Sequence, residues 1–165
     1  MTGAVDDFYI EIVLSTQTLR LYQSAKLLFE ARISGSLKGA GEQENSGCTP
    51  RGWHQVRARI GSECEINTVF RGRRPTGEIY NEQLGAQYPD RDWILTRILW
   101  LSGEEPGINR MGTVDTMRRY IYLHGTPDSE PMGIAMSHGC IRMRNTDIIE
   151  LYDLIPVHTR VLIKE

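Results

Sequence analysis

The sequence predicts one mainly β domain with a short helix near its C-terminus. Its first third alternates apolar and polar residues, as in "FYIEIVL" (8–14), which is typical of strands that bury one face. Two later segments, 95–103 and 118–125, are rich in β-branched and aromatic residues, as central strands are. Residues 145–155 instead space their apolar side chains as one face of a helix does.

The first three predicted strands follow one another closely. In "FYIEIVL", Ile10 and Ile12 fall on one face of the strand and the residues between them fall on the other. "STQT" is a turn, because its hydroxyl and amide side chains compete for backbone hydrogen bonds. "LRLY" and "KLLFEARIS" follow as further strands, joined by "QSA". This order predicts a three-stranded antiparallel start.

The middle of the chain is harder to assign. Residues 35–50 are rich in Gly, Ser and Glu and predict a surface loop, which moves unless something pins it. Residues 53–60 alternate again and predict a strand. Residues 61–94 show no clear periodicity, so we expect long loops packed on the sheet. Together with the 35–50 loop they are candidates to cover a cleft.

The C-terminal part is clearer. Asn145 or Thr146 is expected to cap the helix, and Pro156 is expected to stop it. The final "TRVLIKE" predicts a last strand. The apolar face of the predicted helix consists of Ile148, Ile149, Leu151, Tyr152 and Ile155.

The length, charge and composition of the chain argue against several classes of protein. The chain has 165 residues, a net charge of −2 and neither repeat nor linker, so residues 1–165 are expected to form a single domain. No basic block indicates nucleic-acid binding, and no apolar run approaches the ~20 residues of a membrane helix. The opening "MTGAVDDFYIEIVL" lacks the positive and apolar regions of a secretory signal. We therefore expect a cytoplasmic protein, or a periplasmic one if a signal was removed.

The chain contains three cysteines, Cys48, Cys64 and Cys140. An odd number without a C-x-x-C pair argues against a disulfide framework and against a four-thiolate zinc site. We expect no metal and no cofactor. Cys48 and Cys64 lack the polar neighbourhood of Cys140 and are interpreted as structural or incidental. Cys140 is different, because it lies in "SHGCIRM" (137–143).

A nucleophilic cysteine needs a base or a cation beside it, because the thiolate is the attacking form. His138 stands two residues before Cys140, and residues at i and i+2 of an extended segment point the same way. His124 ends a separate predicted strand, and the connection "GTPDSEPMGIAMS" is long enough to bring that end beside the thiol. We favour His124 as the base and His138 as a supporting residue.

The neighbouring residues fit the same chemistry. The carbonyl of Gly125 is placed to accept the His124 imidazole N–H and fix its tautomer. Gly139 permits a tight turn, so that its N–H and that of Cys140 point at a developing oxyanion. Arg142 shares the orientation of Cys140 and offers a fork for a substrate carboxylate.

These residues bear a family resemblance. "HGT" (124–126) followed by "SHGCIRM" resembles the signature of the LD-transpeptidase family with the YkuD fold, in which a histidine and a spacer precede Ser/Thr-His-Gly-Cys with Arg or Asn nearby. "YIEIVLSTQTLRLYQSAKLLFEARIS" is similar to the family's opening strands, and "CTPRGWHQV" to its Thr-Pro-x-Gly strand entry. "TRILWLSG" and "RYIYLHGT" resemble its later strands. The resemblance runs from about residue 8 to the end.

The resemblance implies a β-sandwich-like domain with a catalytic cleft under a flap. It makes Cys140 the nucleophile and His124 the base. The other matching positions are the second histidine, the turn residues and a substrate-binding arginine: His138, Ser137 with Gly139, and Arg142. We expect Ser137 and Gly125 beside Arg142 on the substrate-binding side, and His138 and Gly139 with the catalytic pair.

The implied substrate is the stem peptide of bacterial peptidoglycan. The thiolate would attack the L-centre carbonyl of the diaminopimelate–D-alanine bond and release D-alanine. The acyl group would then pass to an amine, which gives a crosslink or D-amino-acid exchange, or to water, which trims tetrapeptide to tripeptide. Because we expect no export signal and no wall-binding module, hydrolysis of recycled muropeptides is a serious candidate. A carbapenem is expected to add covalently to Cys140.

Three other interpretations stay open. Cys140 is a packing residue in the first. In the second a zinc site is assembled from four side chains, although no H-x-x-x-H or C-x-x-C spacing supports it: His54, His124, His138 and Cys140. In the third the domain binds muropeptides without turnover.

Overall fold

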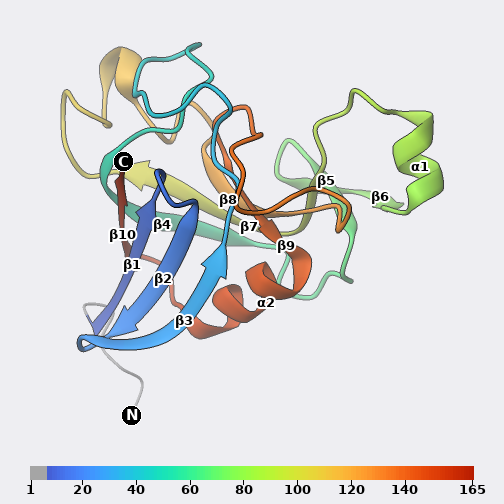
Figure 1. Cartoon of the computed structure of the whole chain (residues 1–165), viewed down its shortest axis with the longest axis horizontal. Coiled ribbons are helices and arrows are strands. Elements are labelled where there is room, and N and C mark those ends of the chain that lie inside the picture. The colour runs from blue at the N-terminus through green and yellow to red at the C-terminus, as the bar shows by residue number, and fades with distance from the viewer. Residues whose placement is uncertain (1–6) are drawn as a thin grey trace.

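Ten strands join into one strongly curled sheet in the computed structural model, which describes residues 7–165 (Figure 1). The strand order is β3-β2-β1-β10-β4-β7-β5-β6, and β8 pairs with β7 on one side and with β9 on the other. The strands are β1 (Phe8–Val13), β2 (Thr18–Gln23), β3 (Lys26–Arg32), β4 (Gly52–Ile60), β5 (Thr68–Arg71), β6 (Arg74–Ile79), β7 (Ile94–Gly103), β8 (Tyr122–Thr126), β9 (Ile141–Arg144) and β10 (Arg160–Lys164). The helices are α1 (Glu82–Gln87) and α2 (Asn145–Leu154), with a 3₁₀ turn at Gly112–Val114.

The N-terminal strands form as the alternation predicts. β1, β2 and β3 pair antiparallel in sequence order, and Ile10 and Ile12 are fully buried. β1 also pairs in parallel with the final strand β10, with Ile10 opposite Val161. The two ends of the described chain therefore lie side by side in the sheet, where their apolar faces share one core.

The main core lies between the curled sheet and α2 (Figure 1). Leu99 and Leu101 of β7 face this core, and Leu151 of α2 packs against the same cluster. Ile98, which directly precedes Leu99, belongs to a smaller apolar cluster that includes Tyr122. Because alternate residues of a strand point to opposite faces, β7 separates the core from the side of the sheet where the cleft lies.

The segment 61–94 differs from the loops that we expected. It contains the β5–β6 hairpin and the helix α1, which extend from the rest of the sheet (Figure 1). Asn81 caps α1 by accepting a hydrogen bond from the Leu84 N–H at 2.8 Å. The hairpin gave no periodic signal because β6 is exposed along nearly its whole length, so neither of its faces needs a row of apolar residues.

One strand boundary also differs, and the 35–50 loop has contacts that hold it. The predicted strand 118–125 begins only at Tyr122, because residues 117–120 form turns and Tyr120 has a left-handed φ of 56°. The 35–50 loop is pinned rather than free. The Arg119 guanidinium donates to the main-chain oxygen of Cys48 at 2.6 Å and to that of Gly41 at 3.2 Å.

The predicted helix cap is wrong. No side chain caps α2, and Asn145 is fully buried in its first turn. The Asn145 Oδ1 accepts a hydrogen bond from Thr96 Oγ1 at 2.6 Å, and its Nδ2 donates to Asn67 Oδ1 at 2.9 Å. Thr96 has a φ of 75°, which is a strained conformation for a β-branched residue. Asn145 therefore ties α2 to β7 and to the loop before β5.

We predict that Asn145→Ala destabilises the fold by about 1–3 kcal/mol, because the buried Thr96 hydroxyl loses its acceptor and Asn67 Oδ1 loses the donor that Asn145 supplies. Urea unfolding of the two proteins measures the difference. Thr146→Ala, at the exposed neighbouring position, is the control and should stay within about 0.5 kcal/mol of the parent. Equal unfolding midpoints for Asn145→Ala and the parent would show that these hydrogen bonds add nothing.

Candidate active site

The parallel pairing of β8 with β9 builds the site. Leu123 lies opposite Ile141, and His124 lies opposite Arg142. Leu123 and Ile141 are fully buried in the main core. Alternation then turns Tyr122, His124 and Arg142 to the other face. The long connection after His124 thus returns the chain beside it, as the sequence predicts.

A cleft of about 500 Å³ opens on this face. The β5–β6 turn, β7, the segment before β8 and the Ser-His-Gly-Cys turn contribute to its walls. Five of the seven predicted site residues line it: Cys140, His124, His138, Ser137 and Arg142. Gly125 and Gly139 do not line the cleft, but their main-chain atoms form hydrogen bonds with residues of the site.

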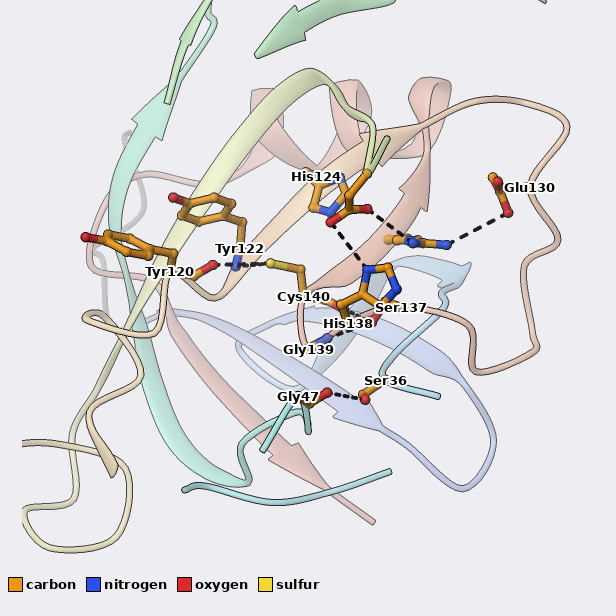
Figure 2. Close-up of polar contacts among 12 residues, drawn as sticks. Ser36, Gly47, Tyr120, Tyr122, His124, Glu130, Ser137, His138, Gly139 and Cys140 are labelled. Atoms are coloured by element: carbon orange, nitrogen blue, oxygen red, sulfur yellow. Dashed lines mark hydrogen bonds and ion pairs between the residues drawn. The ribbon is translucent and has the colours of Figure 1, made fainter. Parts of the chain in front are cut away.

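The Cys140 thiol is held by backbone groups. Its Sγ donates to the main-chain oxygen of Tyr120 and accepts from the main-chain N–H of Tyr122, both at 3.3 Å. Figure 2 shows the sulfur turned toward these two residues. The pKa of the Cys140 thiol is raised to about 12, chiefly by burial and further by the negative charge of Asp92. The thiol is therefore neutral in the free protein at neutral pH.

His124 is fixed in one tautomer. Its Nδ1 lies 2.6 Å from the Gly125 oxygen, and since a carbonyl only accepts, Nδ1 carries the proton. This is the contact that the sequence analysis expected from Gly125. Burial lowers the pKa of His124, against the raising effect of that hydrogen bond. The ring is thus neutral, and its Nε2 has a free lone pair for a proton.

Gly125 has no room for a side chain. A Cβ there would lie 2.6 Å from the Leu95 oxygen and would also overlap Asn145 Oδ1. The close approach of β7 and α2 at this point therefore requires glycine beside His124.

The turn before Cys140 is hydrogen-bonded within itself. Ser137 Oγ donates to the Cys140 oxygen at 2.6 Å and accepts from the Gly139 N–H at 3.3 Å. The Gly139 N–H is therefore used inside the turn, contrary to our expectation that it points at an oxyanion. Gly139 has a φ of 132°, which requires glycine. Thr49, from the expected Thr-Pro-x-Gly strand entry, donates from Oγ1 to the Gly139 oxygen at 2.9 Å.

The Arg142 fork already has partners. Its Nη2 lies 3.2 Å from Asp92 Oδ1, and its Nη1 lies 3.8 Å from Glu130 Oε2. Asp92 Oδ2 also lies 3.7 Å from His138 Nδ1 (Figure 2). Asp92 and Glu130 were missed because each stands in a polar loop, where an acidic residue gives no signal. The carboxylate-binding role of Arg142 stays a prediction, and it requires these acids to be displaced or shared.

Sequence reasoning also missed Arg73 as a cleft residue. Its guanidinium lies 4.7 Å from the ring centroid of Trp100 and 4.8 Å from that of Tyr120. Its Nη1 donates to the Tyr122 hydroxyl at 3.0 Å. Arg73 stands in the turn between β5 and β6, a hairpin that the sequence did not reveal.

The zinc interpretation gains no support. His54 is fully buried away from the cleft, where its Nε2 lies 2.9 Å from Thr116 Oγ1 and its Nδ1 lies 3.0 Å from the Gly52 oxygen. Within residues 7–165 no group of three or more His, Cys, Asp or Glu side chains is arranged to hold a metal ion.

In the same part of the chain, no helix has the length and apolar character to cross a membrane.

A comparison with protein families agrees with the fold. The model of the YkuD L,D-transpeptidase catalytic domain matches residues 7–163. The chain therefore belongs to this family, as the resemblance of its motif predicted, and the mainly β fold class is confirmed.

Individual relatives match shorter segments. YqjB of Bacillus subtilis, named as an L,D-transpeptidase, is 49% identical over 43 residues, which are 26% of this chain and 24% of that protein. YkuD of the same organism is 46% identical over 46 residues, 28% of each chain. The matched segments thus span only about a quarter of the length of these relatives.

Solved structures extend the comparison to the whole fold. An L,D-transpeptidase from Mycobacterium smegmatis has a TM-score of 0.58 at 16% identity, over 96% of this chain and 59% of that one. L,D-transpeptidase 3 from Mycobacterium tuberculosis, in complex with a faropenem-derived adduct, has a TM-score of 0.59 at 15% identity, over 96% and 60%. At these identities the likeness shows the shared fold.

We predict that Asp92→Asn lowers the pKa of Cys140. The substitution removes a negative charge that opposes the thiolate and frees the positive charge of Arg142, which favours it. The rate of Cys140 alkylation by iodoacetamide, followed by peptide mass spectrometry across pH, should rise at a lower pH than in the parent. Asp90→Asn, at an exposed position in the same loop, should leave the profile unchanged. A profile for Asp92→Asn that is unchanged or moves to higher pH contradicts this electrostatic role.

Proposed function

We propose that the protein is a cysteine acyltransferase that acts on the stem peptides of bacterial peptidoglycan. One observation carries the proposal: a neutral His124, with its Nδ1 proton held by Gly125, lines the same cleft as the Cys140 thiol. Nε2 of such a ring is a general base for a thiol. The family supports the substrate class, since its catalytic domain is that of L,D-transpeptidases.

In the first step, Cys140 Sγ attacks the L-centre carbonyl carbon of the diaminopimelate–D-alanine bond. The thiol proton passes to His124 Nε2 as the sulfur–carbon bond forms. His124 then gives this proton to the departing nitrogen of D-alanine as the carbon–nitrogen bond breaks. The product is a thioester on Cys140 and free D-alanine.

The proposal requires a movement of the thiol. In the free protein Sγ donates to the Tyr120 oxygen, so this bond must break before the proton reaches His124. We propose that the Cys140 side chain rotates about χ1 when substrate enters the cleft. Because burial disfavours both the thiolate and the imidazolium, proton transfer then accompanies attack rather than preceding it.

The acyl acceptor decides the outcome of the second step. Water gives a tripeptide and makes the protein an LD-carboxypeptidase. An amine gives a crosslink or an exchanged tetrapeptide, which is the transfer reaction that the names of YqjB and YkuD describe for those proteins. Both outcomes share the thioester, and the cytoplasmic location expected above stays a prediction.

A muropeptide-binding module without turnover is the second candidate. The observation that favours it is the raised pKa of Cys140, because a thiol held neutral by burial is a poor nucleophile. This candidate predicts that the protein binds a disaccharide-tetrapeptide but releases it unchanged.

We predict that the parent protein converts a disaccharide-tetrapeptide with release of D-alanine. Mass spectrometry with and without an added D-amino acid identifies the acceptor: tripeptide alone means hydrolysis, and exchanged tetrapeptide or dimer means transfer. Cys140→Ala should lower the rate by at least about 10³-fold, because it removes the nucleophile. Cys48→Ala is the matched control and should keep the parent rate.

We also predict that a carbapenem acylates Cys140. The strained ring opens onto Sγ without a leaving group, so intact mass should increase by the mass of the whole carbapenem. Neither Cys140→Ala nor a denatured parent should gain this mass. Turnover that persists in Cys140→Ala, together with no adduct on the parent, would overturn the acyl-enzyme mechanism.

A further inference from the structure

Three guanidinium groups line the cleft, and two of them are already engaged. Arg142 faces the carboxylates of Asp92 and Glu130. Arg119 is half-buried and donates to the main-chain oxygens that pin the 35–50 loop. Arg73 is the third, and within residues 7–165 no carboxylate forms an ion pair with it.

Arg73 is nevertheless held in place. Its guanidinium lies over the rings of Trp100 and Tyr120, and one of its N–H groups donates to the Tyr122 hydroxyl. The backbone is fixed as well, because Gly72 and Arg73 have φ values of 55° and 64°, as the two central residues of a type I′ hairpin turn require. Asparagine or glycine usually fills such a position, so a long cation there is an unusual choice.

The same two tyrosines connect Arg73 to the thiol. The main-chain oxygen of Tyr120 and the N–H of Tyr122 contact Cys140 Sγ, while the side chains of both residues contact the Arg73 guanidinium. Tyr120 and Tyr122 therefore each contact both the Arg73 guanidinium and the Cys140 sulfur. An anion bound by Arg73 would lie within the reach of a peptide whose carbonyl meets Cys140.

We propose that Arg73 binds a carboxylate of the acyl donor. A guanidinium has five N–H donors, and only one is used for Tyr122, so a planar edge is free for a bidentate carboxylate. Its charge persists at every pH of interest. Two carboxylates at the diaminopimelate–D-alanine end of the donor have this chemistry, and the proposal is confined to them: the terminal carboxylate of D-alanine and the side-chain carboxylate of diaminopimelate. The inference rests on the proposed function for its substrate class.

Arg73→Gln tests the charge while keeping a donor for Tyr122. We expect kcat/KM for the disaccharide-tetrapeptide to fall about 10- to 100-fold, mainly through KM, since a charge-assisted hydrogen bond to substrate is lost. Arg73→Lys should recover part of the loss, because it keeps the charge without the fork. Arg74→Gln, an exposed residue of the same hairpin, is the matched control and should behave as the parent.

Amidated donors distinguish the two carboxylates. One donor carries an amide on the D-alanine terminus, and the other carries it on the diaminopimelyl side chain. The amide that weakens the parent, but adds nothing to Arg73→Gln, identifies the carboxylate that Arg73 binds. If neither amide shows this non-additive result, the proposal is overturned.

A binding measurement separates this inference from the proposed function. Calorimetry on Cys140→Ala and on Cys140→Ala with Arg73→Gln needs no turnover, and the second protein should bind the disaccharide-tetrapeptide at least about 10-fold more weakly. If the parent shows no turnover but this difference appears, Arg73 binds the peptide and the catalytic proposal fails. If turnover is normal and Arg73→Gln matches the parent, the inference fails and the function stands. Circular dichroism confirms that each variant is folded.

Discussion

The parallel pairing of β8 with β9 is the constraint on which the site depends. Leu123 and Ile141 pack into the core against α2, and this packing fixes the register of both strands. A slip by one residue would turn every side chain to the opposite face. His124 and Arg142 would then enter the core, so the apolar packing of two aliphatic residues determines that the imidazole meets the cleft. Gly125 allows β7 and α2 to approach closely enough for this packing.

Burial then sets the electrostatics. It raises the pKa of Cys140 and lowers the pKa of His124, so both groups rest in their neutral forms. An ion pair of thiolate and imidazolium would have to be made in a poorly solvated place. The hydrogen bond from His124 to Gly125 supports the charged ring only partly. The free protein therefore has an oriented neutral imidazole and a neutral thiol, and under the proposed mechanism the bound substrate must favour the proton transfer between them.

Local patterns predicted much of the fold. β1 shows its alternation because Ile10 and Ile12 face the core while the residues between them do not, and the His-Gly and Ser-His-Gly-Cys segments are compact enough to be read directly. The wrong helix cap and the missed Asp92 have a common cause, which is contact over long sequence distances. Asn145 satisfies the local rule for a cap, yet Thr96 and Asn67 provide stronger partners inside the protein. Asp92 reaches Arg142 across fifty positions of sequence, and no local pattern announces such a pair.

The proposed chemistry and the proposed binding by Arg73 therefore depend on different parts of the molecule. His124 and Cys140 stand on or beside strands whose other face is core, so their positions change only if the packing changes. Arg73 stands on a hairpin whose second strand is largely exposed, and Asp92 and Glu130 stand in loops. Substitutions there leave the main core intact but alter the charge of the cleft wall. A chain built in this way can change the charge of its cleft wall while Cys140 and His124 keep their positions, and the local motif shows only Arg142 of the charged cluster that it forms with Asp92 and Glu130.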